Sequence, residues 1–524
     1  MSNLTENLFA QALRQEDRPA LVFGEESLSF QAIAREVCRV AGGLASIGVG
    51  VGSRVGLLMN SSPAFIFYQQ AIFALGAVFT PLNVFYRSGE IAHAVQSCAL
   101  EYLVVGGDLL GQLPAPGDPR LAPLKAVLTP GLEDAASRGL VAGETLLATS
   151  EPLAAPVQLP ASALGMMLST SATTGTSKGV MLSISNIQAN YDRTPHWLGL
   201  TEETVTLCAL ALYNTFGLNQ CINALMVTGG KLILMPRFEP LGCLKLIERH
   251  RCNFLPAVPT MLQKILDHPE AFRFDLRSLQ RIMTGGAPVP ATLLERIQER
   301  IGAGATVLTG YGLTEATALV TLDQVELGSD GRLLRPKCIG RVLEGMELRI
   351  FREDGNESAP HEVGEIRVRG PNVMLGYHGM PEDTRIALAG GWLHTGDLGY
   401  LDENGYGYIV DRKKDVIIRG GQNIYPADIE DVLYRLPGVC EAAVIGRPHP
   451  ILGEVPVAFV AVGPGVALSA AEVLDACRSE LAHFKVPAGV HFLPELPKGP
   501  TGKILRRALA TEPRNNETTT GNTQ

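Results

Sequence analysis

The stretch Leu168-Ser-Thr-Ser-Ala-Thr-Thr-Gly-Thr-Ser-Lys-Gly-Val180 is the most informative part of this 524-residue chain. It follows the apolar run 163–168 and is rich in hydroxyl side chains and glycine. Hydroxyl and backbone N–H groups donate to phosphate oxygens, glycine lets the backbone approach, and Lys178 adds a positive charge. The stretch therefore predicts a strand that ends in a phosphate-binding loop. It is not a Gly-x-x-x-x-Gly-Lys-Ser/Thr loop, because Gly179 and Val180 follow the lysine.

A second motif, Gly310-Tyr-Gly-Leu-Thr-Glu315, follows the strand-like run 305–309. Tyr311 offers an aromatic face on which a base can stack, and Thr314 offers a hydroxyl donor for phosphate. Glu315 supplies a carboxylate oxygen, the kind of ligand that Mg²⁺ prefers. The structural alternative is a strand end followed by a helix that Thr314 caps.

Three further motifs lie downstream, in addition to the glycine turn Thr284-Gly-Gly-Ala-Pro288. Asp397 belongs to Trp392-Leu-His-Thr-Gly-Asp-Leu398, and Arg412 belongs to the charged run Asp411-Arg-Lys-Lys-Asp415. Lys503 ends Pro497-Lys-Gly-Pro-Thr-Gly-Lys503. Each of them alone is read more simply as a turn or as a solvated surface, so their meaning depends on their occurring together.

Together and in this order, the motifs resemble those of the adenylate-forming superfamily of acyl-CoA synthetases, luciferases and amino-acid adenylation domains. The usual first loop there is Ser/Thr-Ser-Gly-Thr-Thr-Gly-x-Pro-Lys-Gly. This chain departs from it at Ala172, which replaces a glycine, and at Ser177, which replaces a proline. Tyr-Gly-x-Thr-Glu matches without a departure. The resemblance covers nearly the whole chain.

The resemblance implies a role for each matching residue. ATP and its phosphates would be held by the first loop, the glycine turn 284–288 and the motif 310–315. The residues are Thr170, Ser171, Thr173, Thr174, Gly175, Lys178, Gly286, Ala287, Pro288, Tyr311, Gly312 and Thr314. Glu315 would bind Mg²⁺, and Asp397 with Arg412 would bind the ribose. Lys503 would stabilise the charge that develops during adenylation. Lys414 would be the hinge of a mobile C-terminal domain.

The segment Leu210-Ala-Leu-Tyr-Asn-Thr-Phe-Gly-Leu218 bears on the acid that is activated. It contains no acidic residue to hold an α-ammonium group, so an amino acid is disfavoured. Asn214 and Phe216 are expected to line the acyl site together with Gly285, Gly286 and Gly421. The apolar neighbours favour a fatty or other apolar acid, although core packing explains them equally well. Asn214 stands where acyl-CoA synthetases usually have histidine.

The predicted function is therefore that of an AMP-forming acyl-CoA synthetase. A carboxylate attacks the α-phosphate of ATP to give acyl-adenylate and pyrophosphate, and the thiol of CoA then displaces AMP. The loop Gly420-Gly-Gln-Asn-Ile-Tyr-Pro-Ala-Asp-Ile-Glu430 matches the acyl-CoA synthetase version of the small-domain loop.

Two alternatives stay open. A ligase that loads an acyl carrier protein would share the nucleotide motifs and would need a basic docking face, for which Arg435, Arg447 and Lys485 are candidates. A nucleotide-binding homologue without ligase activity would explain the departures at Ala172, Ser177 and Asn214. The presence of the two lysines and of both carboxylates argues against it.

Composition narrows the remaining classes. The net charge of −9 disfavours nucleic acid as a partner. The N-terminus lacks the features of a signal peptide, and no apolar run has the length of a membrane span. The nine cysteines are scattered without metal-binding spacing. We therefore expect a cytoplasmic monomer or homodimer whose small-molecule partners are an acid, ATP and CoA.

The order of the predicted elements gives the fold class. Helical patterns alternate with short β runs, which indicates an α/β domain with parallel-rich sheets flanked by helices. From about residue 338, alternating runs such as Glu347-Leu-Arg-Ile-Phe351 indicate a β-rich subdomain. We expect an N-terminal AMP-binding and acyl-substrate domain at 1–413, a small mobile α+β domain at 414–510 and a disordered tail at 511–524.

Overall fold

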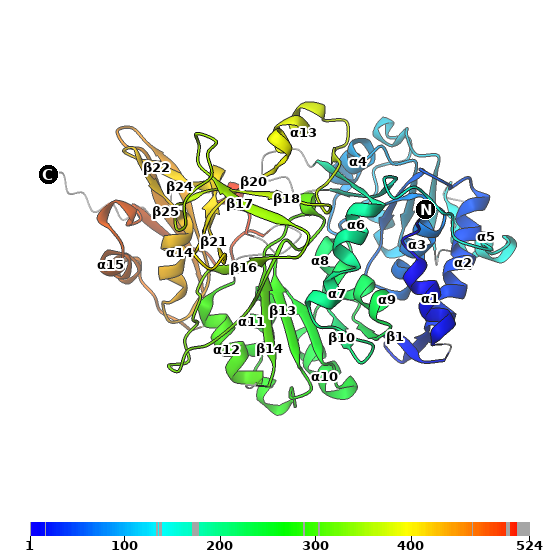
Figure 1. Cartoon of the computed structure of the whole chain (residues 1–524), viewed down its shortest axis with the longest axis horizontal. Helices are drawn as coiled ribbons and strands as arrows, with labels where there is room; N and C mark the ends of the chain where they lie inside the picture. Colours follow the sequence, from blue (N-terminus) through cyan, green and yellow to red (C-terminus); the bar gives the residue numbers. More distant parts are fainter. Residues whose placement is uncertain are drawn as a thin grey trace.

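The computed structural model describes residues 2–15, 17–130, 132, 135, 139–169, 178–286, 289–301, 304–463, 465–498 and 504–510. The chain forms a large body, which contains the N-terminus, and a smaller lobe, which contains the C-terminal elements (Figure 1). Helices and strands alternate throughout the large body.

The largest sheet of the described residues has 13 strands. Six neighbouring strands pair in parallel, in the order β1, β11, β10, β12, β13 and β14. From β14 onward, β15 and β16 pair antiparallel. The α/β part and the β-rich part therefore share one continuous sheet. From edge to edge its members are β17 (Glu347–Phe351), β18 (Gly364–Arg369), β20 (Leu393–Leu401), β21 (Gly407–Arg412), β16 (Cys338–Val342), β15 (Thr321–Gln324), β14 (Thr306–Gly310), β13 (Arg281–Gly285), β12 (Phe254–Ala257), β10 (Val205–Cys208), β11 (Lys231–Leu234), β1 (Pro19–Phe23) and β2 (Glu26–Ser29).

A second sheet of 8 strands lies in the N-terminal part of the large body. Its inner strands are parallel and buried, which is why β3 reads as an almost continuous apolar run. Its members, in order, are β19 (Gly376–Tyr377), β9 (Gly179–Ser183), β8 (Leu164–Ser169), β4 (Val78–Pro81), β3 (Arg54–Leu58), β5 (Tyr102–Val105), β6 (Ala126–Thr129) and β7 (Val141–Ala142).

Helices of the large body connect and cover these sheets, and several begin at a side-chain cap. Ser29 accepts a hydrogen bond from the N–H of Ala32 at 3.2 Å, and Ser62 accepts one from Phe65 at 3.3 Å. The helices are α1 (Glu6–Arg14), α2 (Phe30–Ser46), α3 (Pro63–Ala74), α4 (Ser88–Ser97), α5 (Gly143–Thr149), α6 (Ile184–Tyr191), α7 (Thr194–Trp197), α8 (Thr215–Gly217), α9 (Ala224–Thr228), α10 (Pro240–His250), α11 (Pro259–Leu266), α12 (Ala291–Ile301) and α13 (Pro381–Ala387).

One hydrophobic core joins the two large sheets. It includes Phe79 from the second sheet, Leu232 from the first, and the helix residues Phe30 and Phe65, all of which are buried. The helices α6, α7 and α8 lie in the middle of the large body (Figure 1). The segments that follow β9 and β10 therefore pack in the same hydrophobic core as the strands of the first sheet.

The smaller lobe is built on a sheet of 5 strands, covered by helices α14 (Pro426–Tyr434), α15 (Ala470–Glu480) and α16 (Arg506–Ala510). Successive residues of β24 point to opposite faces. Val444 packs in the cluster that contains α14 and α15, whereas Ile445 packs with Leu509 of α16. The strands are β23 (Gln422–Ile424), β22 (Ile417–Arg419), β25 (Gly453–Val462), β24 (Val439–His449) and β26 (Gly489–Phe492).

The predicted fold class is confirmed: an α/β body with parallel-rich sheets and a β-rich part is followed by a small α+β lobe. The domain boundaries stay predictions, and the proposed tail at 511–524 lies outside the described residues. All nine cysteines are free thiols, and only Cys440 is exposed. Within the described part of the chain, no helix combines the length and the apolar character needed to cross a membrane.

Candidate active site

The carboxyl ends of β13 and β14 form the centre of the candidate site. These neighbouring parallel strands end at Gly285 and Gly310, which pair in register, and such strand ends are where open α/β sheets bind ligands. The backbone leaves no room for a side chain at Gly312, since a Cβ there would lie 1.9 Å from the carbonyl oxygen of Ala318. This close approach fixes the turn that carries Tyr311 and Glu315.

Tyr311, Asp397 and Arg412 form a connected polar group. The hydroxyl of Tyr311 donates to Asp397 Oδ2 at 2.6 Å, and Arg412 Nε lies 3.2 Å from Asp397 Oδ1. The antiparallel pairing of β20 with β21 places Asp397 directly opposite Arg412. Burial and the neighbouring carboxylate hold the pKa of Tyr311 well above its usual value, so its hydroxyl remains a donor. The structure thus brings together three residues that were predicted separately.

Lys178 and Glu315 both contact Tyr377. The ammonium of Lys178 lies 4.8 Å from the centre of the Tyr377 ring and forms an ion pair with Asp383. The Tyr377 hydroxyl donates to Glu315 Oε1 at 3.0 Å. Burial and Glu315 raise the pKa of Tyr377. Tyr377 of β19 therefore contacts both the ammonium of Lys178 and the carboxylate of Glu315.

Sequence reasoning missed Tyr377 and Asp383. Tyr377 lies on β19, which pairs with β9 just after Lys178, although nearly two hundred residues separate these strands. Asp383 lies on α13. Neither residue belongs to a recognised motif, and only the Gly-Tyr pair that ends the run 373–377 marks the position in the sequence.

The predicted acyl-site residues adopt two different roles in the fold. Asn214 is the N-cap of α8, and its side chain accepts a hydrogen bond from the N–H of Gly217 at 3.1 Å. Phe216 packs against a cluster that includes Met283 and Leu308, so it lies behind the ends of β13 and β14. A Cβ placed on Gly286, whose φ is +76°, would lie 4.0 Å from the Phe216 ring.

Lys414 lies in the short 3₁₀ segment Lys413–Asp415 that follows β21. Burial lowers its pKa, and Asp415 and Asp397 are among the groups that oppose this shift. Gly421 is exposed, with φ of +82°, in the turn between β22 and β23 of the small lobe. The structure thus places Lys414 near the Asp397 group and Gly421 on the surface of the lobe.

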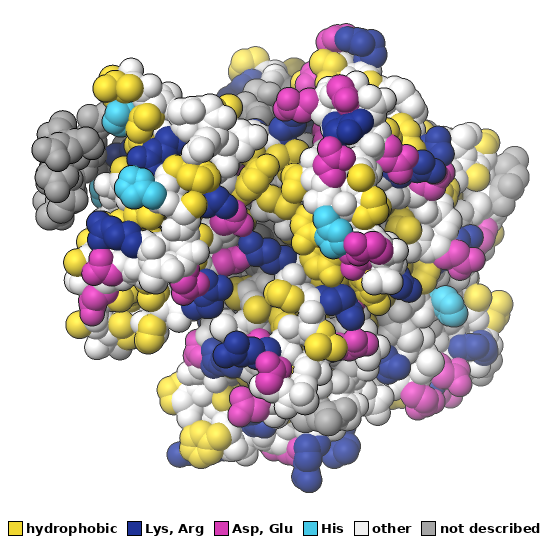
Figure 2. All heavy atoms as spheres, turned by 60° about the vertical axis from the view of Figure 1, so that its left-hand side comes forward, with side chains coloured by type: hydrophobic (Ala, Val, Ile, Leu, Met, Phe, Trp, Pro, Cys, Tyr) yellow, Lys and Arg dark blue, Asp and Glu magenta, His cyan; other side chains and the backbone are white. Residues whose placement is uncertain are grey.

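Ion pairs connect the large body to the small lobe. Lys337, which precedes β16, lies 2.5 Å from Asp431 Oδ2 and 3.4 Å from Asp428 Oδ1, both on α14. On the link itself, Asp411 Oδ2 accepts a hydrogen bond from the N–H of Ala427 at 3.0 Å. Between the two parts the surface is hollowed, and basic and acidic side chains are visible inside the hollow (Figure 2).

Several predicted residues lie outside the described part of the chain. The residues that precede and follow the first loop are Ser169, the last residue of β8, and Lys178, next to β9. Lys503 is preceded by Lys498, which forms a bridge with Ile504. The undescribed candidates are Thr170, Ser171, Thr173, Thr174, Gly175, Ala287, Pro288 and Lys503.

The fold and this arrangement of carboxylates, cations and glycine turns define an adenylate-forming enzyme. Residues 8–378 match the AMP-binding enzyme family, and residues 428–503 match the AMP-binding enzyme C-terminal domain. The chain belongs to this family.

Known relatives can be aligned with nearly the whole chain. A long-chain-fatty-acid–CoA ligase of Bacillus subtilis is 32% identical, over 96% of this chain and 93% of its own length. A feruloyl-CoA synthase of an Amycolatopsis species is 36% identical, over 93% and 94% respectively. The solved structure of O-succinylbenzoate coenzyme A synthetase from Bacillus subtilis with ATP and magnesium is 29% identical, with a TM-score of 0.81 over 96% of this chain and 98% of that one.

The resemblance found in the sequence is thus confirmed. The chain is an AMP-forming acid–thiol ligase of the acyl-CoA synthetase type, and ATP, Mg²⁺ and CoA are the cofactor and co-substrates of its class.

Proposed function

We propose that this enzyme activates a fatty or other apolar carboxylic acid as its acyl-adenylate and transfers the acyl group to CoA. The observation that carries the choice of acid is the character of the segment 209–218. It contains no charged residue, and its amide side chain, Asn214, caps α8. Phe216 adds an aromatic face beside the glycine turn. A charged substituent on the acid would have no counter-charge in this segment.

The nucleotide roles follow from the chemistry of the two polar groups. Asp397 has a buried side chain that accepts a hydrogen bond from Tyr311 and forms an ion pair with Arg412. We propose that its carboxylate also accepts the ribose hydroxyls, with Arg412 holding it in place. Lys178 is positioned by Tyr377 and Asp383, and the phosphates of ATP would compete with Asp383 for its ammonium. Such preorganised charge stabilises a developing anion without further rearrangement.

Glu315 fits the predicted Mg²⁺ site by its donor chemistry. It offers carboxylate oxygen, the ligand that this hard cation prefers, and its Oε1 is oriented by the Tyr377 hydroxyl. When bound, Mg²⁺ would neutralise phosphate charge. Lys503 is proposed to stabilise the approach of the acid carboxylate to the α-phosphate, because two anions must meet there.

Carrier-protein loading is the less supported alternative. Of its three candidate docking residues, Arg435 forms an ion pair with Glu480, and Lys485 Nζ lies 2.8 Å from Asp428 Oδ2. The third, Arg447, lies 5.7 Å from the ring of Phe459. Since each of these cations already has a partner within its own lobe, an acidic carrier helix would have to displace it.

Pyrophosphate release from ATP, Mg²⁺ and a panel of carboxylic acids tests the proposal. The panel should contain straight-chain, aromatic, dicarboxylic and amino acids, each with CoA, with a carrier protein or with neither thiol. We expect CoA-dependent turnover with an apolar acid. Turnover with dicarboxylates or amino acids alone would overturn the substrate class, and turnover only with the carrier would overturn the choice of CoA.

A further inference from the structure

A second, polar cavity lies apart from the candidate active site. Its volume is about 60 Å³, and it is bounded by α1, α3, α6 and the π-helical segment η4 (Leu218–Asn223). None of its lining residues belongs to the candidate nucleotide or acyl site. This space is sufficient for a few water molecules or for one ion with part of its hydration shell.

Buried amide oxygens without partners face this region. Gln69 and Gln70 are each 4% exposed, and neither Oε1 has a hydrogen-bond partner among the described residues. Their helix, α3, is otherwise mostly apolar, with Phe65, Ile66 and Ile72 buried around them. A buried acceptor left unpaired costs about 1–3 kcal/mol. Two adjacent glutamines at such positions therefore indicate a bound species that supplies the missing interactions.

The charge of the lining is negative. Asp192 and Glu6 line the cavity, and none of the described residues that line it is a lysine, arginine or histidine. Among the ion pairs of the described residues, none includes Asp192; the one hydrogen bond to its side chain comes from Asn7 Nδ2 at 3.3 Å. Burial, with a smaller contribution from Glu6, raises the pKa of Asp192 to about 6. Water alone would leave this carboxylate without a counter-charge.

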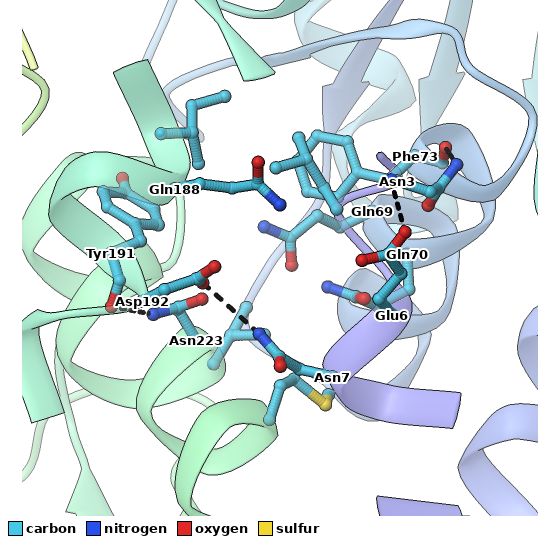
Figure 3. A pocket seen from close by; sticks show the side chains of 14 residues that line it. Asn3, Glu6, Asn7, Gln69, Gln70, Phe73, Gln188, Tyr191, Asp192 and Asn223 are labelled. Atoms are coloured by element: carbon cyan, nitrogen blue, oxygen red, sulfur yellow. Dashed lines mark hydrogen bonds between the residues drawn. The ribbon is translucent and has the colours of Figure 1, made fainter. Parts of the chain in front are cut away.

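The side chains of Gln69, Gln188 and Asp192 point from three sides toward the same space (Figure 3). Glu6 differs from them, because it is exposed and its Oε1 accepts a hydrogen bond from the N–H of Asn3 at 3.0 Å. One carboxylate and neutral amide oxygens thus surround the enclosed part of the cavity.

We propose that this cavity binds one monovalent metal cation, K⁺ or Na⁺, through the carboxylate of Asp192 and the amide oxygen of Gln69. Carboxylate and carbonyl oxygens are the ligands of hard cations, and rings of carbonyl oxygens replace the hydration shell of K⁺. A single enclosed carboxylate balances one positive charge. A divalent cation would retain an excess charge in a largely buried place.

The position gives the ion a structural role. Through these two ligands it would join α3, which carries Gln69, to the C-terminal end of α6, where Asp192 lies. An ion that binds the folded state alone raises its stability in proportion to occupancy. We therefore expect the melting temperature of the full chain to depend on which cation is present.

Melting temperatures in KCl, NaCl and choline chloride at equal ionic strength provide the first test. We expect the parent to melt a few degrees higher in K⁺ or Na⁺ than in choline. Asp192→Asn and Gln69→Met should melt cooperatively in choline and lose the difference between salts. Asp354→Asn, which neutralises an exposed carboxylate elsewhere, should keep it. Equal melting in all three salts would overturn the proposal, as would a rise in melting temperature that only added CaCl₂ produces.

Crystals of the parent soaked in RbCl give a second test that does not depend on the variants folding. An anomalous peak of Rb⁺ is expected between Gln69 and Asp192. A cavity that holds only water, with no anomalous peak, would overturn the proposal.

Discussion

Asp397→Asn is the substitution that bears most directly on the nucleotide site. It keeps the size of the side chain and removes its charge. Asp397 is 5% exposed, and its two oxygens face the Tyr311 hydroxyl at 2.6 Å and Arg412 Nε at 3.2 Å. The asparagine amide retains one acceptor oxygen, so at least one charge-assisted hydrogen bond is lost. Such a bond contributes about 1.5–3 kcal/mol. Because about 1.4 kcal/mol corresponds to tenfold, kcat/KM for ATP should fall about 10- to 150-fold.

The assay is pyrophosphate release at varied ATP, repeated with 2′,3′-dideoxy-ATP. If Asp397 accepts the ribose hydroxyls, the parent should prefer ATP strongly and Asp397→Asn should lose most of that preference, which isolates the pairwise interaction. Asp354→Asn, an exposed turn aspartate, is the matched control. The reasoning is refuted if the variant discriminates between the two nucleotides as well as the parent does.

Two further substitutions test other parts of the site, and a third tests the stability of the small lobe. Lys503→Ala should slow adenylation about 10²- to 10³-fold, as loss of one stabilising charge does, while CoA should still capture acyl-adenylate that is supplied ready-made. Tyr377→Phe keeps the ring beneath Lys178 but removes the hydroxyl that donates a hydrogen bond to Glu315. The apparent Mg²⁺ affinity measured in turnover should therefore weaken about 3- to 30-fold. Arg506→Met removes the partner 2.9 Å from Glu430 Oε2 and should destabilise the small lobe by about 3–5 kcal/mol.

The Arg506 prediction also has a pH dependence. Burial raises the pKa of Glu430 from 4.5 to about 7. The folded state therefore holds this proton more tightly than the unfolded state, and the contribution of Glu430 to stability falls as pH rises through this interval. Without the guanidinium the pKa rises further, so Arg506→Met should lower the melting temperature more above pH 7 than near pH 4.5. An equal loss at both pH values would contradict the assignment.

The Lys503 prediction has a matched control, and each of the other two outcomes can be contradicted. Lys245→Ala removes an exposed lysine from α10 and should leave adenylation unchanged. Equal slowing of adenylation and thioester formation in Lys503→Ala would show that this lysine is not specific to the first step. Unchanged Mg²⁺ dependence in Tyr377→Phe would show that the tyrosine does not orient Glu315.

Local sequence patterns predicted many of the individual elements. The strand-like run 305–309 became β14 within one residue, and the alternating run 347–351 became β17. The position of a short element with a strong apolar pattern can be predicted from the local sequence, because the pattern itself indicates which residues are buried. The motif 310–315 was also recognisable from its residues. The structure adds the reason for its second glycine, since close backbone contact leaves no room for a side chain at Gly312.

Long-range contacts were not predictable in this way. Tyr377 reaches Lys178 only because β19 adds to the edge of the second sheet beside β9, a pairing that no local pattern encodes. The continuity of the α/β and β-rich parts through β14, β15 and β16 was missed for the same reason. The expected role of Asn214 at the acyl site stays a prediction; what the sequence did not indicate is that its side chain caps α8, an interaction that depends on the turn geometry.

The most direct test of the central claim is detection of both products of the two half-reactions by mass spectrometry. The purified enzyme would be incubated with ATP, Mg²⁺ and an apolar carboxylic acid, and CoA would be added only after the first sample is taken. The account predicts an acyl-adenylate before CoA and its conversion to acyl-CoA and AMP afterwards. Absence of any acyl-adenylate across the acid panel, or an adenylate that CoA does not consume, would contradict it.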